Sequence, residues 1–407
     1  MNSISKQGVI TIGTLGHVDH GKTTLTKALT GVWTDKFSES IKRNMTIKLG
    51  YADVAIRRCP VCEEPRCYSI NERCKYCGSK TEEVRRISII DSPGHETLMA
   101  TAIAASNIID AVLFVIAANE PCPMPQTREH AMVVNMLGIK NIIIVQTKVD
   151  IVGKEAAKNH YKQIKEFVKG TVMENAPIVP VVSTQDLNID YLLKLILEIK
   201  VPDRKLDDDP LMYVARSFDI NKPGTKISDL KGGVIGGSII QGKFKVNDII
   251  EIKPGVKIKL KGEHEDYHTI TTRIKSIYAF NDRLDEAIAG GLVAFATEID
   301  PFFTKSDSLV GSVVGLKGRA PDAIKSCTLS YHNLNRPDIP KRGFIENEQL
   351  VLIVGTATTV GVVTKVKKDK ITVNLSKPVV ILKSSKIAVF RRDNNRWRLT
   401  GYATLSD

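Results

Sequence analysis

The sequence predicts an α/β domain with a mostly parallel sheet, followed by two all-β barrel domains. Three observations lead to this prediction. Up to about residue 206, short apolar runs alternate with stretches of helical periodicity, which is typical of βαβ units. Beyond that point the helical periodicity disappears, and short β-branched runs separated by Gly, Asn and Asp replace it. At 407 residues, the chain is also too long for a single compact core.

In the first domain, strands and helices are expected to follow one another along the chain. The expected strands are Val9–Leu15, Arg86–Asp91, Ala111–Ala118, Asn141–Gln146 and Ile178–Ser183. The expected helices are Lys22–Gly31, Glu96–Ile108, Gln126–Leu137, Glu155–Lys169 and Ile189–Ile199. This order predicts a sheet covered by helices on both faces.

A charged, proline-flanked stretch, Val201–Pro210, is predicted to link the first domain to the barrels, and a weaker break falls at Gly315–Asp322. We therefore expect domains at 1–206, 207–320 and 321–407. Strands predicted for the first barrel include Val234–Gln241, Asp248–Ile252, Thr269–Ile277 and Leu292–Thr297. Those predicted for the second include Leu350–Gly355, Gly361–Val366, Lys370–Leu375 and Lys386–Phe390.

The chain is basic, with 58 Lys and Arg against 45 Asp and Glu, and the excess is uneven. Residues 361–407 carry eleven Lys or Arg and three Asp, which favours an anionic partner such as RNA. A solvated, soluble face is the alternative interpretation. The first eight residues are polar, and no apolar run approaches the length of a membrane span. We expect a cytoplasmic protein without a membrane partner.

The stretch Gly16–Thr23 fits G-x-x-x-x-G-K-[ST], the pattern of a phosphate-binding loop. It lies between an expected strand and an expected helix, so backbone N–H groups would point at phosphate oxygens. The Lys22 ammonium would reach the β and γ phosphates, and the Thr23 hydroxyl would bind Mg²⁺. The residues expected to hold the nucleotide here are Asp19, His20, Gly21, Lys22, Thr23 and Thr24.

A second nucleotide signature, Asp91-Ser-Pro-Gly94-His95, follows an expected strand. Asp91 would hold Mg²⁺ through a bound water, and the Gly94 N–H would contact the γ phosphate, so that its loss releases the loop. His95 is placed to orient the attacking water, as the catalytic residue. Thr46, between the two signatures, is a candidate for a second hydroxyl ligand of Mg²⁺.

Thr147-Lys148-Val149-Asp150 follows the expected strand Asn141–Gln146 and indicates a guanine base. Guanine presents two donors, N1–H and the exocyclic amine, and the Asp150 carboxylate can accept from both. The alkyl chain of Lys148 can lie on the base. The nucleotide is therefore expected to be GTP, although this tetrapeptide alone would fit a solvated strand end.

Two CxxC pairs, Cys59/Cys62 and Cys74/Cys77, are separated by eleven residues. Each pair can aim two thiolates at one point, and four thiolates make a closed tetrahedral Zn²⁺ site. A closed site has no open position for substrate, so the zinc is expected to be structural. Of the other cysteines, Cys67 is a spare thiol or an occasional ligand.

Together these residues resemble the translational GTPases, most closely the gamma subunits of archaeal and eukaryotic initiation factor 2. The supporting stretches are 13–25, 45–53, the cysteine pairs, 91–101, 117–130, 216–225, 231–242 and 396–402. The resemblance implies GTP hydrolysis and carriage of methionylated initiator tRNA to the small ribosomal subunit. It also implies an alpha subunit bound through the second domain, a beta subunit bound through the first, and base contacts from Ser183 and Thr184.

Some positions depart from this family. Thr147 stands where Asn is usual, Ser183-Thr184 where Ser-Ala is usual, and Asn44 where Gly is usual; the third-domain segment Tyr331–Glu348 also differs. Two alternatives to the initiation factor therefore stay open. One is a paralogous GTPase with an altered tRNA or ribosome role, and the other is a scaffold that keeps the fold without the switch. The intact Lys22 and Asp91 argue against the scaffold.

Overall fold

The computed structural model describes residues 6–35, 49–95, 98–258, 266–334, 336, 338–383 and 385–406. The chain divides into two compact units, one spanning Gln7–Asp203 and the other beginning at Arg204 and containing both barrels. The division lies inside the charged stretch Val201–Pro210. Among the described residues, no helix is both long enough and apolar enough to span a lipid bilayer.

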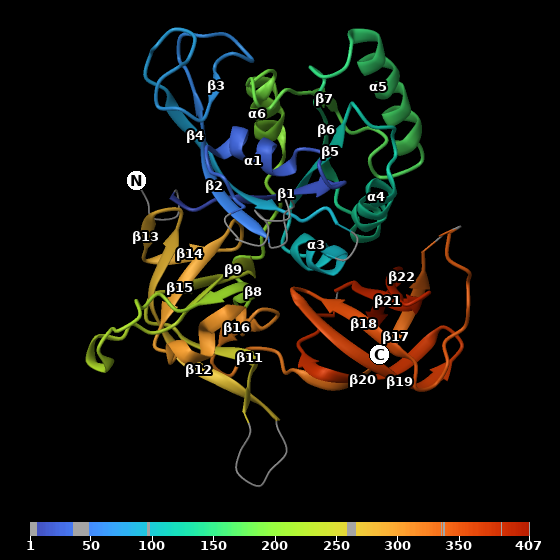
Figure 1. Cartoon of the computed structure of the whole chain (residues 1–407). Helices are drawn as coiled ribbons and strands as arrows, with labels where there is room; N and C mark the ends of the chain where they lie inside the picture. The colour runs from blue at the N-terminus through green and yellow to red at the C-terminus, as the bar shows by residue number, and fades with distance from the viewer. Residues whose placement is uncertain are drawn as a thin grey trace. The chain divides into compact units, whose positions relative to one another are not determined.

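The first unit is built on a seven-stranded sheet in the order β3-β2-β4-β1-β5-β6-β7, with helices packed against it (Figure 1). Its strands are β1 (Ile10–Gly16), β2 (Gly50–Arg58), β3 (Tyr68–Ser69), β4 (Glu82–Asp91), β5 (Ala111–Ala117), β6 (Asn141–Thr147) and β7 (Ile178–Pro180). Its helices are α1 (Lys22–Thr30), α3 (Met99–Ser106), α4 (Pro125–Leu137), α5 (Lys154–Val168) and α6 (Ile189–Glu198).

The centre of this sheet is parallel, as predicted, because β4, β1, β5, β6 and β7 pair in the same direction. All seven residues of both β1 and β5 are buried, which explains why these strands appear in the sequence as continuous apolar runs. In parallel strands the carboxyl ends lie at one edge. The loops after β1, β4 and β6, which carry the three nucleotide signatures, therefore share an edge.

The sheet extends beyond the five predicted strands. β2 pairs antiparallel with β4, and β3 pairs antiparallel with β2. β2 alternates buried and half-buried residues, the pattern of a strand with one covered face. The sequence of β2 shows this alternation only weakly, because Tyr51 and Ala55 on the half-buried face are not polar. The last strand is shorter than expected, ending at Pro180 rather than at Ser183.

The second unit contains two barrels of antiparallel strands. In the first barrel the ring β11-β16-β8-β9-β15-β12 is closed by pairing of β11 with β12. Its strands are β8 (Leu211–Phe218), β9 (Val234–Gln241), β11 (Ile249–Ile258), β12 (Asp266–Ala279), β15 (Val293–Thr297) and β16 (Val313–Leu316). Short additional elements are β10 (Lys243–Lys245), β13 (Asp282–Leu284), β14 (Glu286–Ile288), η3 (Ile227–Asp229) and η4 (Pro301–Asp307).

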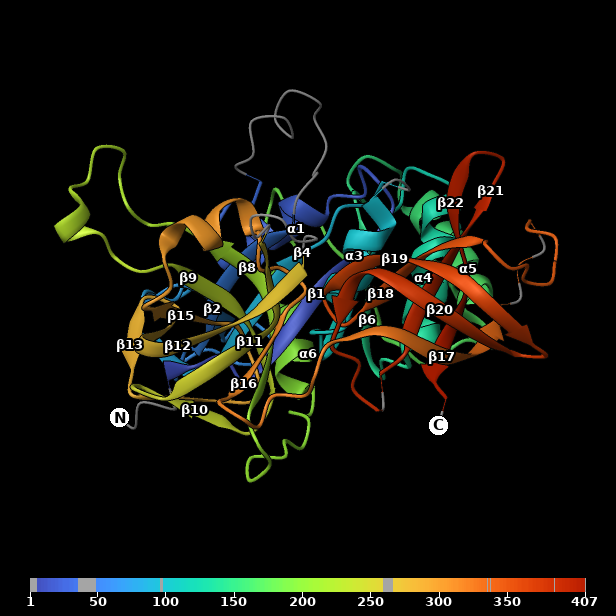
Figure 2. The same ribbon diagram turned by 90° about the horizontal axis from the view of Figure 1, so that it is seen from below.

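The second barrel closes in the order β17-β20-β19-β18-β21-β22, and its strands wrap around one apolar core (Figure 2). Its strands are β17 (Ile324–Asn333), β18 (Gln349–Val354), β19 (Ala357–Lys367), β20 (Lys370–Val379), β21 (Ile387–Asp393) and β22 (Arg396–Leu405). Closure removes the free edges that would otherwise invite other strands. It also brings the segment at 338–348 against β21 and β22.

Candidate nucleotide-binding site

The phosphate-binding loop leaves β1 at Gly16 and enters α1 at Lys22. Gly21 caps the helix with φ 86°, in the left-handed region, and Asp19 has φ 60°. Glycine adopts this conformation without strain. The N-terminal N–H groups of α1 have no side-chain cap, so they are available to phosphate oxygens.

The Lys22 side chain is only 6% exposed, and its Nζ donates to the backbone carbonyl of His17 at 2.5 Å. Burial lowers the pKa of Lys22 to about 8, while the charges of Asp91 and Asp19 favour the protonated form. A buried ammonium that donates to a neutral carbonyl gains most from an incoming anion. This side chain is therefore suited to a phosphate group.

Asp91 lies at the end of β4, and three hydroxyl groups surround its carboxylate. Thr14 donates at 3.0 Å, Thr23 at 2.7 Å and Thr34 at 2.8 Å. Burial raises the pKa of Asp91, and the hydroxyl donors and the Lys22 charge oppose that rise. The Thr23 hydroxyl and the Asp91 carboxylate are hard oxygen donors, so this donor set fits Mg²⁺. Thr46, the other expected ligand, lies outside the described residues.

Gly94 packs directly on the phosphate-binding loop. A Cβ atom at this position would lie 2.5 Å from Nζ of Lys22 and 2.8 Å from the Val18 nitrogen. Only glycine fits this approach, so the second signature reaches the phosphate site through its backbone. His95 follows at once and is half-buried, while its neighbours at 96–97 lie outside the described residues.

The residues expected to recognise the base do not all have the same surroundings. The Thr147 hydroxyl is buried and donates to the His20 carbonyl at 2.6 Å, so it ties the end of β6 to the phosphate-binding loop. Lys148 takes φ 57°, and Asp150 is exposed in the turn that follows. The Ser183 hydroxyl is buried, and none of the described residues bonds to it, whereas Thr184 is exposed.

A cavity of about 560 Å³ adjoins this base edge, within the usual range for ligand pockets. It is bounded by α1, by α6, by the loop at 183–186 and by residues 68–75. Representative lining residues are Thr24, Lys27, Trp33, Ile70, Asn71, Ser183, Thr184 and Leu193. Thr24 and the 183–184 pair, expected from the sequence to contact the nucleotide, therefore share one cavity.

Two buried histidines lie around the loop: His20, which was expected to hold the nucleotide, and His130, which was not predicted. The His20 ring lies between the Val115 carbonyl and the Glu120 carboxylate, at 3.1 Å from each. His130, on α4, is completely buried, and within the described residues neither ring nitrogen makes a hydrogen bond of good geometry. The backbone of Gly94 nevertheless favours its protonated form and so raises its pKa, against the larger effect of burial. The only sequence signal was its place in the family-like stretch 117–130.

The four predicted zinc ligands come together in space. The ligand atoms of Cys59, Cys62, Cys74 and Cys77 all lie within 4.8 Å of one another. The Sγ atoms of Cys59 and Cys77 are 3.4 Å apart, and those of Cys62 and Cys74 are 3.6 Å apart. A tetrahedral zinc with Zn–S of about 2.3 Å requires about 3.8 Å between thiolates, so the donor set fits Zn²⁺.

The predicted knuckle, residues 59–77, is fastened to α6. The Tyr76 hydroxyl donates to Asp190 at 2.9 Å, and Lys194 pairs with Glu64 at 2.9 Å. Cys67 is fully buried beside the cluster but does not belong to the four-thiol group. The knuckle therefore braces the wall of the cavity rather than supplying a reactive centre.

Family models match most of the chain. Residues 7–202 match the elongation factor Tu GTP binding domain, and residues 232–315 match elongation factor Tu domain 2. Residues 331–405 match the C-terminal domain of initiation factor eIF2 gamma. The three matches follow the α/β domain and the two barrels in order.

Relatives of similar length were also found. The chain is 50% identical over 407 residues to translation initiation factor 2 subunit gamma of Methanocaldococcus jannaschii, covering 98% of each chain. It is 50% identical over 409 residues to the protein of the same name from Pyrococcus abyssi, covering 99% of this chain and 98% of the other.

Two solved structures are similar in fold. A bacterial selenocysteine-specific elongation factor gives a TM-score of 0.73 at 25% identity, over 98% of this chain and 58% of its own. Elongation factor SelB from Methanococcus maripaludis, solved with a GTP analogue, gives 0.73 at 23% identity, over 100% of this chain and 80% of its own.

Proposed function

Because the chain belongs to the family of translation initiation factor 2 gamma subunits, we propose that it carries methionylated initiator tRNA to the small ribosomal subunit. It is a translational GTPase, which hydrolyses GTP to GDP and phosphate. It would act as the gamma subunit of a heterotrimer with an alpha and a beta subunit. The observation that best supports this role is the convergence of Lys22, Thr23, Asp91 and Gly94 on one phosphate site.

The γ phosphate would be recognised by charge and by backbone together. Lys22 would supply a desolvated cation, and Gly94, which packs on Nζ of Lys22, would offer its N–H to an oxygen of the terminal phosphate. Bound Mg²⁺, held by Thr23 and Asp91 with Thr46 as a further candidate, would neutralise phosphate charge. When the terminal phosphate leaves, Gly94 would lose its hydrogen-bond acceptor, and the loop after Asp91 would be free to change conformation.

His95 is the proposed catalytic residue. It follows Gly94 directly, so its side chain would lie near a terminal phosphate that the Gly94 N–H contacts and could orient the attacking water. Neutral His130 lies behind Gly94 and would support that segment from α4. Hydrolysis would be slow until a partner completes the environment of the transition state.

Guanine would be selected by Asp150, whose exposed carboxylate can accept from both guanine donors. Thr147 holds the loop through His20 but has no amide to offer the base, so one family contact is weakened. Four further residues would contact the phosphates and the ribose of the nucleotide: Asp19, His20, Gly21 and Thr24. Ser183 and Thr184 would contribute from the far edge of the base.

The RNA partner would meet the basic surface of the barrels, since residues 361–407 carry eleven Lys or Arg against three Asp. The alpha subunit would bind the first barrel and the beta subunit the GTPase domain. The four cysteines would hold a structural Zn²⁺. Such a factor would work in the cytoplasm, together with the ribosome.

The test is filter binding of methionylated initiator tRNA in the GTP and GDP states, with and without an alpha subunit. We expect tighter binding with GTP, by a coupling free energy of about 1–3 kcal/mol. RNA binding without a preference for initiator tRNA would favour the paralogue with an altered role. No RNA or ribosome binding in either state would favour the scaffold.

A further inference from the structure

The rim of the second barrel contains an arrangement of arginines that the GTPase activity does not use. It lies between the segment 338–348, together with Arg336, and the hairpin formed by β21 and β22. Two carboxylates there, Glu348 and Asp338, are each shared by two arginines. Each group of three side chains is therefore left with an excess positive charge.

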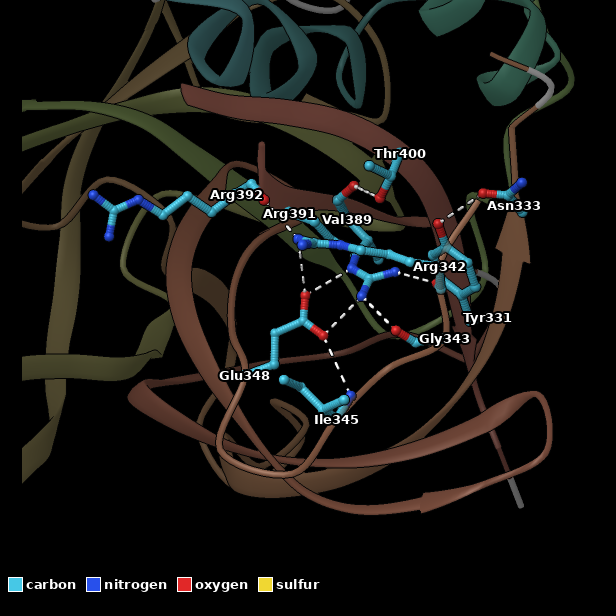
Figure 3. Close-up of polar contacts among 10 residues, drawn as sticks. All are labelled: Tyr331, Asn333, Arg342, Gly343, Ile345, Glu348, Val389, Arg391, Arg392 and Thr400. Atoms are coloured by element: carbon cyan, nitrogen blue, oxygen red, sulfur yellow. Dashed lines mark hydrogen bonds and ion pairs between the residues drawn. The ribbon is translucent and has the colours of Figure 1, made fainter. Parts of the chain in front are cut away.

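The first group is centred on Glu348 (Figure 3). Arg391 is 4% exposed and binds both Glu348 oxygens, at 2.7 and 2.8 Å. It also donates to the carbonyls of Arg342 and Gly343, and it stacks on Phe344 with 4.2 Å to the ring centroid. The Arg342 guanidinium lies 3.5 Å from the same carboxylate while half of its side chain stays exposed.

The second group is centred on Asp338. Arg336 is buried and binds both oxygens of Asp338, at 3.1 and 2.8 Å, and the carbonyl of Leu399 at 3.0 Å. Arg398 donates to the same carboxylate at 2.6 Å. These contacts hold Arg336 and Asp338 against β22 and fix the shape of the rim.

Two further cations remain uncompensated. Within the part of the chain that the structure describes, the side chains of Lys341 and Arg392 are exposed and have no ion-pair partner. Figure 3 shows that the Arg392 side chain extends away from Glu348. Over Arg336, residues 338–348 and the β21–β22 hairpin, seven Lys or Arg stand against four carboxylates, so this rim attracts anions.

A pocket of about 70 Å³ opens in the middle of these groups. Five cationic residues line it, together with Thr400 and one acidic residue, Asp393; the cationic residues are Arg336, Lys341, Arg342, Arg391 and Arg392. This volume is far below the roughly 300–1,000 Å³ of ordinary ligand pockets, so it suits one small anionic group rather than a whole nucleotide. Guanidinium groups match the oxygens of phosphate in planar geometry.

An exposed aromatic ring favours RNA over other anions at this rim. Trp397 is 40% exposed and lies directly across the β21–β22 ladder from Arg392. Arg396 and Arg398 flank it in sequence. A flat ring among cations is suited to stacking an unpaired base beside a phosphate, whereas an acidic peptide needs no such ring.

We propose that this rim is a binding site for single-stranded RNA, with one backbone phosphate in the arginine-lined pocket and a neighbouring base stacked on Trp397. The inference rests on the proposed function, because it names where RNA meets the second barrel. In this proposal Lys341 and Arg392 neutralise backbone phosphates, and Trp397 stacks on a base. The two carboxylate-centred groups fix the shape of the rim that presents them.

The experiment compares two pairs of substitutions that remove equal charge from exposed lysines or arginines. The double variant K341Q/R392Q alters the rim. The control, K243Q/K245Q, alters strand β10 of the first barrel, outside 361–407, where both lysines are exposed and have no ion-pair partner among the described residues. Trp397→Ala removes the ring, and Trp397→Phe keeps a stacking surface. The probes are fluorescein-labelled oligouridine and initiator tRNA, followed by anisotropy over a range of salt concentrations.

We expect Trp397→Ala to weaken oligouridine binding roughly 5- to 100-fold and Trp397→Phe to stay near the unmodified protein. The slope of log K against log salt is negative. K341Q/R392Q should make it shallower by about 0.7 for each phosphate that the rim no longer neutralises, and the control pair should leave it unchanged. Equal effects of the two charge pairs, or an unchanged Trp397→Ala, would overturn the proposal. Competition with polyglutamate gives a further test. If polyglutamate displaces oligouridine equally well from the unmodified protein and from Trp397→Ala, the rim is a site for acidic protein and the proposal is wrong.

This outcome is separable from the proposed function. If the unmodified protein shows no GTP preference for initiator tRNA, yet K341Q/R392Q and Trp397→Ala still weaken oligouridine binding, the carrier function fails and the RNA site stands. If the GTP preference persists while every variant binds oligouridine like the unmodified protein, the RNA site fails and the carrier function stands.

Discussion

Lys22 in the nucleotide site and Arg391 in the second barrel are both buried cations, 6% and 4% exposed, but their surroundings differ. Lys22 donates to one neutral carbonyl, and burial lowers its pKa to about 8. Arg391 has a bidentate carboxylate and two carbonyls. The first charge is left for a ligand to satisfy, whereas the second is satisfied by the protein. Loss of the first should therefore affect binding, and loss of the second should affect folding.

The largest effect should come at the nucleotide site, from His95→Ala. We expect partner-stimulated GTP turnover to fall by roughly 10²- to 10⁴-fold, since a positioned water-orienting group contributes that much. Nucleotide affinity should change little, because His95 is not among the groups expected to contact the phosphates in the ground state. Single-turnover hydrolysis beside GDP titration checks both parts, and intact stimulated hydrolysis would remove His95 from this role.

In the barrel, Arg391→Leu should lower the free energy of unfolding by about 3–5 kcal/mol, because Glu348 would remain buried without its main partner. Denaturant unfolding of the barrel measures this. Arg342→Leu is the control, since its side chain is half exposed and should cost no more than about 1 kcal/mol. The double change R391L/E348L should recover part of the loss. If it recovers nothing, packing rather than charge pairing holds this cluster.

Lys22→Gln should weaken nucleotide binding without lowering stability, in contrast to Arg391→Leu. Affinity for GDP should fall by about 1.5–3 kcal/mol, the value of a charge-assisted contact, while thermal stability stays the same or rises. Stability should not fall, because the substitution removes a desolvated charge that donates to a neutral carbonyl. Calorimetry and thermal unfolding of the same sample separate the two effects. A large loss of stability would contradict the contrast with Arg391.

Acid should destabilise the two regions over different pH ranges. Burial lowers the pKa of His20 to about 4 and that of His130 to about 3, so both rings take up a proton on unfolding below about pH 6.5. The GTPase domain should therefore lose about 2 kcal/mol of stability between pH 6.5 and 5.5.

In the barrel rim the relevant group is a carboxylate, Asp338, rather than a histidine. Arg336 lowers the pKa of Asp338, so the stability from that pair is present above the ordinary carboxyl pKa and is lost only in stronger acid. Hydrogen exchange resolved by domain measures this contrast. His130→Asn should reduce the acid-induced loss of stability of the GTPase domain by about 1 kcal/mol between pH 6.5 and 5.5, and equal acid sensitivity of both regions would contradict the assignment.

The smallest effect should come from Thr147. Thr147→Val leaves the His20 carbonyl without its 2.6 Å donor, so GDP affinity should fall by about 1 kcal/mol as the loop loosens. Thr147→Asn restores the family's amide and should bind GDP at least as tightly as the natural chain. Tighter binding by the valine variant would show that the hydroxyl does not support the loop.

Local sequence patterns predicted the parallel strands and the order of the domains well. β1 and β5 are buried on both faces and therefore appear as unbroken apolar runs, and the cysteine spacing by itself places four thiolates together. The antiparallel strand β2 was not predicted, because Tyr51 and Ala55 on its half-buried face obscure the alternation of apolar and polar residues. Its place in the sheet depends on pairing with β4.

Contacts between distant residues could not be predicted in the same way. Arg391 and Glu348 are 43 residues apart and meet only because the second barrel closes. A lone histidine such as His130 gives no sign of its burial, because burial depends on α4 packing near Gly94. The hydroxyl of Thr34 on Asp91 likewise depends on how the chain leaves α1. Such polar contacts require the assembled fold.

Recognition of a guanine nucleotide is tested most directly by calorimetric titration of the protein with GDP and with ADP in the presence of Mg²⁺. If Lys22 and the backbone hold the phosphates while Asp150 selects the base, GDP should bind and ADP should bind at least about 100-fold more weakly, because adenine cannot offer the two donors that Asp150 accepts. Equal affinity for the two nucleotides would contradict this assignment, and would show that the site holds phosphate without selecting guanine.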